Sequence, residues 1–213
     1  MTTHNYITIG YDCSPASVLR NLELREHALP FDWVVSNIES LKMCFRERFH
    51  RYHTDLKYNA NRSRLIDVYG FQFPHDYPHI NIADGSPCQF TEVGEGDIVE
   101  EKTQCITPQW PKYYNEVKAK YDRRIERFLG IMADPKPIIV LCRYPTSTVK
   151  QLKIMFALYF HKTNVFFVNS TTEPNDPSFP WIYNCYTEET GEWNRAEIWK
   201  MGIDMIVSRM FIV

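Results

Sequence analysis

The chain has 213 residues, of which 44% are hydrophobic, 15% aromatic and 23% charged. A chain of this length and composition can bury one substantial core without disulfides or a structural metal, so we expect a single domain over residues 1–213. With 24 Lys and Arg against 26 Asp and Glu, the net charge of -2 excludes a uniformly basic surface. We therefore expect no nucleic-acid partner.

The N-terminal segment and the cysteine spacing both indicate where in the cell the protein is expected. Residues 1–11 contain no Lys or Arg and only a short apolar run, unlike a signal peptide. No stretch approaches the roughly 20 apolar residues of a membrane-spanning helix. The six cysteines stand singly, as is typical of free thiols in a reducing compartment: Cys13, Cys44, Cys88, Cys105, Cys142 and Cys185. We expect a cytoplasmic protein with no membrane insertion, metal or cofactor.

The first half of the chain predicts one strand and two helices. Residues 6–10 read as a short buried strand ended by glycine, and the Ser-Pro pair that follows predicts a helix over 14–24. Ser36 and Glu39 form a capping-box pattern for a second helix. Its expected inner face repeats at helical spacing: Ile38, Leu41, Phe45, Phe49 and Tyr52. Residues 53–105 are expected to be mostly loop, with short strand candidates around Leu65–Tyr69 and the acidic stretch Glu92–Glu101.

The second half shows clearer patterns. Apolar residues at spacings of three and four predict a long amphipathic helix from Thr107-Pro108 onward: Tyr114, Val117, Tyr121, Ile125, Phe128 and Met132. Strand, helix, strand, strand and helix are then expected at 137–142, 146–161, 164–168, 181–186 and 194–209. Asn194 and Glu197 are the expected cap of the last helix. This order predicts a three-layer α/β domain, with a mostly parallel sheet flanked by helices.

Cys13 is the first candidate for chemistry, because it lies between the glycine exit of a strand and the start of a helix. Unpaired N–H groups and the positive end of the helix dipole favour an anion, so a thiol there can ionise more easily and act as a nucleophile. A lone cysteine is also often a small core residue. The same junction binds phosphate in α/β proteins, which makes Gly10 and Ser14 candidate ligand-binding residues, although no complete phosphate-loop motif is present.

His75 is the candidate base. It sits among aromatic residues that could partly bury its ring, and the neighbouring Asp76 could orient it. The alternative is an ordinary histidine on a surface loop. Arg124 and Arg127 on the long helix are candidate anion ligands, or else part of a solvated helix face. Arg143 follows a buried strand, where ligands of α/β sheets gather, or it pairs with a structural carboxylate.

Several of these segments together resemble a family described as papain-like cysteine peptidases, found in bacteria and large DNA viruses. They are Ile7-Thr-Ile-Gly-Tyr-Asp-Cys13, Leu19-Arg20, Pro30-Phe-Asp-Trp33, Phe73-Pro-His-Asp76 and Arg123-Arg-Ile-Glu-Arg-Phe128. The resemblance covers the chain to about Arg143. It implies that Cys13 is the nucleophile, His75 its base, and Asp32 or Asp76 the group that orients the imidazole. It also implies an α+β fold, in which a cysteine-bearing helix faces a mostly antiparallel barrel.

We therefore expect a cysteine-dependent hydrolase or acyl transferase acting on a peptide, glycan or small molecule. One alternative is a glycosyltransferase-like protein that binds a nucleotide sugar or phosphorylated ligand in a crevice: Gly10, Cys13, His75, Arg124 and Arg143. Another is a non-enzymatic interaction domain with Tyr and Trp on its partner surface. The hydrolase requires a close Cys13–His75 pair, whereas the binding protein requires basic side chains converging on the Gly10–Ser14 turn.

Overall fold

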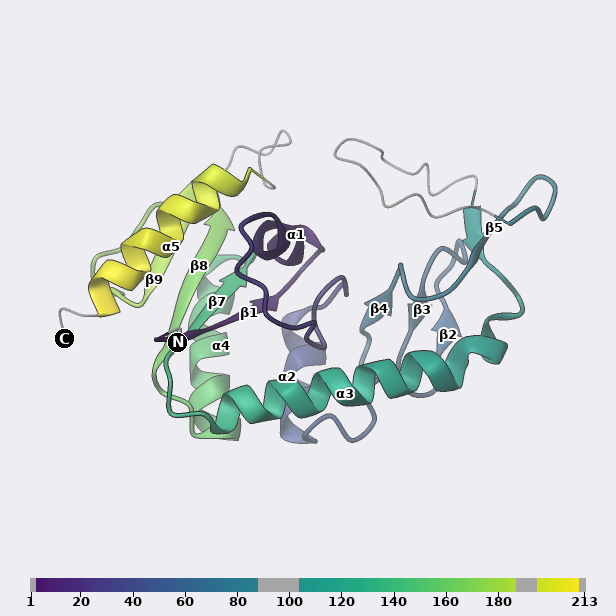
Figure 1. The fold of residues 1–213 in the computed structure, drawn as a ribbon, viewed down its shortest axis with the longest axis horizontal. Helices are drawn as coiled ribbons and strands as arrows, with labels where there is room; N and C mark the ends of the chain where they lie inside the picture. Colours follow the sequence, from purple (N-terminus) through teal and green to yellow (C-terminus); the bar gives the residue numbers. More distant parts are fainter. Residues whose placement is uncertain (1–2, 88–103, 187–194, 211–213) are drawn as a thin grey trace.

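The computed structural model describes residues 3–87, 104–186 and 195–210. Its centre is a four-stranded sheet with the order β1-β7-β8-β9, in which every neighbouring pair is parallel (Figure 1). The strands are β1 (Asn5–Ile9), β7 (Ile138–Cys142), β8 (Val165–Thr171) and β9 (Ile182–Tyr186). The register sets Ile7 opposite Val140 and Val140 opposite Phe167. The prediction of an α/β fold with a mostly parallel sheet is confirmed.

Helices cover both faces of this sheet. The bounds are α1 (Ser14–Asn21), α2 (Ile38–Arg46), α3 (Tyr114–Ala133), α4 (Thr146–Phe160) and α5 (Ala196–Met210), and a 3-10 turn (Trp110–Tyr113) precedes α3. Strand β7 is completely buried and alternates between two cores. Ile139 and Leu141 join the core under α1 and α5, whereas Ile138 and Val140 join the core under α2, α3 and α4. The continuous apolar run of β7 is explained by this burial on both faces.

The larger core is rich in aromatic rings. Phe45 of α2 lies 6.0 Å from Phe128 of α3 and 5.7 Å from Phe156 of α4, between ring centroids. Phe31, from the turn before α2, meets Phe128 edge to face at 5.5 Å. Such ring pairs each add about 0.5–1.5 kcal/mol beyond the area they bury. They fix the position of the turn that carries residues 31–33.

Two small antiparallel sheets lie beside the parallel sheet, and α3 extends along both regions (Figure 1). One sheet has three short strands, β2 (Lys57–Tyr58), β3 (Leu65–Ile66) and β4 (Gln72–Phe73). The other pairs β5 (His79–Asn81) with β6 (Gln104–Ile106). Residues 53–105 were expected to be mostly loop with a short strand near Leu65, and the described part agrees, since only strands of two or three residues interrupt its turns. The other short strands were not predicted, because two or three residues are too few to show an alternating pattern.

Several predicted helix ends need correction. Helix α1 ends at Asn21 rather than near residue 24. The cap of α2 is Asn37, whose side chain accepts a hydrogen bond from the Ser40 amide at 2.9 Å, so Ser36 is not the cap. Helix α2 ends at Arg46, since the chain turns through the left-handed region at Phe49, with φ of 63°. Residues 92–101 and Asn194 lie outside the described residues.

None of the helices in the described ranges is both long enough and apolar enough to cross a membrane.

Candidate functional site

Two backbone bridges bring Cys13 and His75 together. The carbonyl oxygen of Gly10 accepts hydrogen bonds from the Ser36 amide at 3.2 Å and the Ser36 hydroxyl at 2.5 Å. The neighbouring Val35 exchanges two 3.0 Å backbone bonds with Gln72 of β4. Cys13 follows Gly10 by three residues and His75 follows Gln72 by three. The Sγ of Cys13 lies 3.8 Å from Nε2 of His75, a distance at which a thiol can hydrogen-bond an imidazole.

Cys13 is the residue at the N-cap of α1, and its carbonyl accepts a hydrogen bond from the Ser17 amide at 3.1 Å. The adjacent Asp12 supplies the side chain that the helix start lacks from Cys13 itself. One Asp12 oxygen accepts from the Ser14 amide at 2.9 Å and the Ser14 hydroxyl at 2.5 Å, and the other pairs with Arg143 at 2.7 Å. The first turn of α1 therefore already holds a carboxylate.

Gly10 is needed at this turn for a steric reason. A side-chain carbon at residue 10 would collide with the carbonyl oxygen of Asp12. The sharp exit from β1 therefore requires a residue without a Cβ atom. It turns the chain at once into α1 and leaves the Cys13 side chain half-buried rather than sealed in the core.

His75 is held from two sides. Its ring meets the indole of Trp33 edge to face, with centroids 6.4 Å apart and planes at 85°. The next residue, Asp76, binds to α3, where its carboxylate accepts from Lys120 at 2.5 Å and from the Tyr121 hydroxyl at 2.7 Å. The short segment after β4 is thus tied to the long helix.

The electrostatic surroundings favour an uncharged thiol and an uncharged imidazole. Burial, followed by the negative charge of Asp12, raises the pKa of the Cys13 thiol, and Arg64 partly opposes this. His75 is exposed at the surface, and partial desolvation of its ring is the main effect that lowers its pKa, against the upward effect of Asp76. A preformed thiolate–imidazolium pair is therefore disfavoured at rest. The sequence expectation of an easily ionised thiol considered only the helix dipole and not Asp12.

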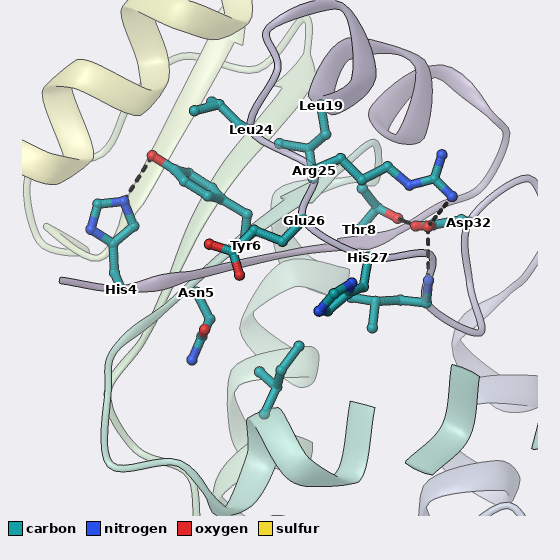
Figure 2. Close-up of a pocket in the computed structure, with 12 residues that line it drawn as sticks. His4, Asn5, Tyr6, Thr8, Leu19, Leu24, Arg25, Glu26, His27 and Asp32 are labelled. Atoms are coloured by element: carbon teal, nitrogen blue, oxygen red, sulfur yellow. Dashed lines mark hydrogen bonds and ion pairs between the residues drawn. The ribbon is translucent and has the colours of Figure 1, made fainter. Parts of the chain in front are cut away.

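Asp32 has other partners in this structure. One oxygen accepts from the Thr8 hydroxyl at 2.5 Å, and the other accepts from the Leu29 amide at 2.9 Å and pairs with Arg25 at 3.1 Å (Figure 2). The carboxylate is buried and ties β1 to the turn before α2. An orienting role toward His75 stays a prediction for Asp32, and Asp76 is the carboxylate whose charge raises the pKa of that ring.

The predicted basic ligands do not gather in one place. Arg143 reaches the Gly10–Ser14 turn, where it neutralises Asp12. Arg124 lies over the ring of Tyr121 at 5.2 Å, and Arg127 donates to the carbonyl of Ala28 at 3.4 Å. These contacts assign structural partners to both residues of α3.

Three residues at the site were missed by sequence reasoning as functional candidates. Trp33 packs on His75, Arg20 stacks on Trp33, and Arg64 donates to Gln72 at 3.1 Å and acts electrostatically on both Cys13 and His75. The first two lie inside segments that carried the family resemblance, so that signal was available. Arg64 belongs to a short strand region without a readable pattern.

A separate cavity of about 80 Å³ lies beside Asp32 (Figure 2). It is lined by His4, Asn5, Tyr6, Thr8, Leu19, Leu24, Arg25, Glu26, His27, Leu29, Asp32 and Ile131. Neither Cys13 nor His75 lines this cavity. Within the described ranges, no three or more His, Cys, Asp and Glu side chains are grouped as metal ligands.

Comparison with known proteins identifies the family of this chain. Residues 4–165 match the model of the family described as "Putative papain-like cysteine peptidase", which is more than half of the chain. The chain belongs to this family. It is also similar to an uncharacterized protein of Acanthamoeba polyphaga mimivirus, with 24% identity over 206 residues, covering 83% of this chain and 81% of the viral protein. No solved structure matches it significantly.

The matched range contains the whole candidate site. Cys13, Trp33, His75 and Arg143 all lie between residues 4 and 165, whereas β9 and α5 lie beyond it. Family members are thus expected to share β1, α1, the antiparallel segment and α3. The α+β fold with a mostly antiparallel barrel, which the resemblance implied, is not found. The central sheet is parallel, and antiparallel pairing is confined to short strands in two small sheets.

Proposed function

We propose that the protein is a cysteine-dependent acyl hydrolase or acyl transferase, with Cys13 as nucleophile and His75 as base. The observation that carries this proposal is the 3.8 Å distance between Sγ and Nε2 at the start of α1. Two regions that are remote in sequence converge there, and the bridges through Gly10 and Gln72 fix their approach. The family description supports the same reaction class.

The chemistry follows from the neutral resting pair. As Sγ attacks the carbonyl carbon of an ester or amide, the thiol proton passes to Nε2 of His75. The C–O or C–N bond then breaks, and the leaving group takes that proton. A thioester on Cys13 remains until water or another acceptor attacks it, with His75 receiving the attacking proton and returning it to sulfur.

The phosphate-binding alternative receives little support from the turn itself. The amide of Ser14, which a phosphate would need, already donates to Asp12. The negative charge of Asp12 also disfavours a second anion next to it. The nucleotide-sugar alternative stays a prediction of the sequence.

The test is acylation by 4-nitrophenyl esters and amides of short acyl groups and peptides, followed by intact and peptide mass spectrometry. We expect one acyl group on Cys13, with release of 4-nitrophenolate from the esters and of 4-nitroaniline from the amides. Cys13→Ala should abolish both, and His75→Ala should slow acylation by about 10²–10⁴-fold, the usual contribution of a general base.

Cys105→Ser is the matched control, because Cys105 is also half-buried but lies on β6. This variant should acylate like the unaltered protein. Circular dichroism of each variant confirms that it is folded. Acylation that persists in Cys13→Ala, or that is unaffected in a folded His75→Ala variant, would contradict the proposal.

A further inference from the structure

A second pair of side chains extends the site along α1. Arg20 follows Cys13 by seven residues, which is two helical turns, so both lie on one face of α1 about 10 Å apart along its axis. The Arg20 guanidinium carbon lies 5.1 Å from the ring centroid of Trp33. Trp33 in turn meets His75 edge to face. Cys13, His75, Trp33 and Arg20 therefore form a continuous surface.

The backbone conformation of Trp33 is unfavourable in free energy, and burial of its side chain does not offset this strain. Its φ is 65°, in the left-handed region that a bulky side chain disfavours by about 1–3 kcal/mol. Its neighbours Phe31 and Val34 are fully buried, but the indole of Trp33 is only half-buried. The strained backbone thus presents a large aromatic face beside the His75 ring instead of burying it in the core.

The charge of Arg20 is available at this surface. The residue is exposed, and in the described ranges its guanidinium contacts the indole but forms no ion pair with a carboxylate. Arg143, by contrast, is neutralised by Asp12 at the other end of the site. Asp12 disfavours an anion next to the thiol, whereas Arg20 favours one two turns away. Along α1, the electrostatic potential therefore becomes more favourable to an anion from the Cys13 end toward Arg20.

We infer that Arg20 and Trp33 form a specificity subsite for a carboxylate carried by the acyl substrate, about two helical turns from the bond that Cys13 attacks. This inference rests on the proposed function and adds the class of substrate to it. The guanidinium has the planar donor geometry that matches a carboxylate. The indole holds the guanidinium in place and offers an apolar face to the chain that links the carboxylate to the acyl group.

The experiment compares two alkylating reagents of equal reach, N-bromoacetyl-6-aminohexanoic acid and its neutral carboxamide. Both alkylate a thiol by displacement of bromide, and only the first carries a carboxylate at its far end. Rate constants at Cys13 are measured by peptide mass spectrometry. We expect the acid to react about fivefold faster than the amide, as for a partly exposed ion pair, and the preference to fall in 1 M salt.

Arg20→Gln should reduce this preference to about one. The preference is taken as the ratio of the acid rate to the amide rate within each variant, so a change in the reactivity of Cys13 itself cancels. Arg20→Lys should restore part of the preference. Arg209→Gln is the matched control, since Arg209 also stacks on an aromatic ring, that of Tyr183 at 5.5 Å on α5. It should keep the full preference.

The outcomes separate this inference from the proposed function. If Cys13 reacts with the neutral amide and depends on His75, but shows no charge preference or keeps it in Arg20→Gln, the subsite is wrong and the nucleophile stands. If Cys13 reacts no faster than Cys105 with either reagent, the proposed function fails, and the subsite fails with it.

Discussion

At the scale of single residues, Asp12 and Arg64 set the protonation of the candidate pair. Asp12 begins α1 by binding the Ser14 amide, and the same carboxylate raises the pKa of the adjacent thiol. Arg64 lowers the pKa of both Cys13 and His75. The base is therefore kept neutral and able to accept a proton, while the thiol keeps its own proton until a substrate arrives.

Replacing Asp12 by Asn should lower the pKa of Cys13. The amide oxygen of Asn can still accept from Ser14, so the change removes the charge and keeps the helix start. The pH profile of iodoacetamide alkylation at Cys13, followed by mass spectrometry, should move to lower pH. Asp204→Asn, a charge change on α5, is the control and should leave the profile in place. An unchanged profile in Asp12→Asn would show that Asp12 does not control the thiol.

Replacing Arg64 by Gln should shift both groups in the opposite direction. Loss of the positive charge raises the pKa of the Cys13 thiol and that of the His75 imidazole together. Alkylation of Cys13 should therefore require higher pH, and the His75 ring protons should titrate at higher pH by nuclear magnetic resonance. A shift in only one of the two groups would place Arg64 near one of them alone.

At the scale of elements, the carboxyl ends of the parallel strands carry different kinds of side chain. Near the carboxyl ends of β8 and β9, the side chain of Asn169 in β8 donates to the Tyr144 carbonyl at 2.9 Å and to the side chain of Asn184 in β9 at 3.1 Å. Asn175 exchanges two further bonds with the Asn184 backbone. The buried amides of Asn169 and Asn184 therefore have their hydrogen bonds within the protein. The reactive side chains lie instead after β1, the edge strand.

Packing of α5 on the sheet depends on Gly202. A methyl group at this position would lie 2.5 Å from the Cys185 sulfur and 2.8 Å from a methyl of Val168. Gly202→Ala should therefore destabilise the fold by about 1–3 kcal/mol through overpacking, measured by urea denaturation. Gly130→Ala on α3 is the matched control, because nothing lies within 4 Å of the added carbon. It should stabilise the fold by about 0.5–1 kcal/mol, and equal effects would contradict the packing argument.

At the scale of the whole molecule, a buried histidine connects α3 with the antiparallel segment. His53 is fully buried, stacks on Tyr121 at 4.8 Å and hydrogen-bonds the Tyr77 hydroxyl at 3.2 Å. Burial lowers its pKa to about 4. Between pH 6.5 and 4 the unfolded chain binds this proton and the folded chain does not, so folding stability falls as the pH falls.

His53→Asn should remove this pH dependence, since Asn tolerates the left-handed φ of 57° at this position. Comparison of urea unfolding free energies should show that the unaltered protein loses up to about 3 kcal/mol relative to the variant between pH 6.5 and 4. A constant difference across that range would contradict the assignment. The lost ring packing lowers the stability of the variant by an amount that is independent of pH.

Asp67 changes folding stability with pH in the direction opposite to His53. Burial raises its pKa to about 6, although it accepts hydrogen bonds from the amides of His53, Tyr69 and Phe71. The folded chain therefore binds this proton more readily, and stability gains as the pH falls from about 6 to 3.8. Asp67→Asn should make the loss of stability in acid steeper than in the unaltered protein. The unaltered chain should show a flatter profile, because the two residues offset each other.

The sequence by itself determined the elements with long periodic or apolar patterns. The run at residues 137–142 and the spacing along α3 are strong signals because each residue contributes to one buried face. These elements and their order were sufficient for the α/β prediction. Cys13 and His75 were also named from local pattern and family resemblance, each for a reason visible within a few residues.

Only the tertiary structure decided which of these residues meet. No local pattern records that Ser36 binds Gly10 or that Val35 pairs with Gln72, and these two bridges set the 3.8 Å approach of Cys13 to His75. The effect of Asp12 on the thiol and the partners of Asp32 likewise depend on distances through space. Periodicity reports burial along one element, whereas a site is built from contacts between elements that are far apart in the chain.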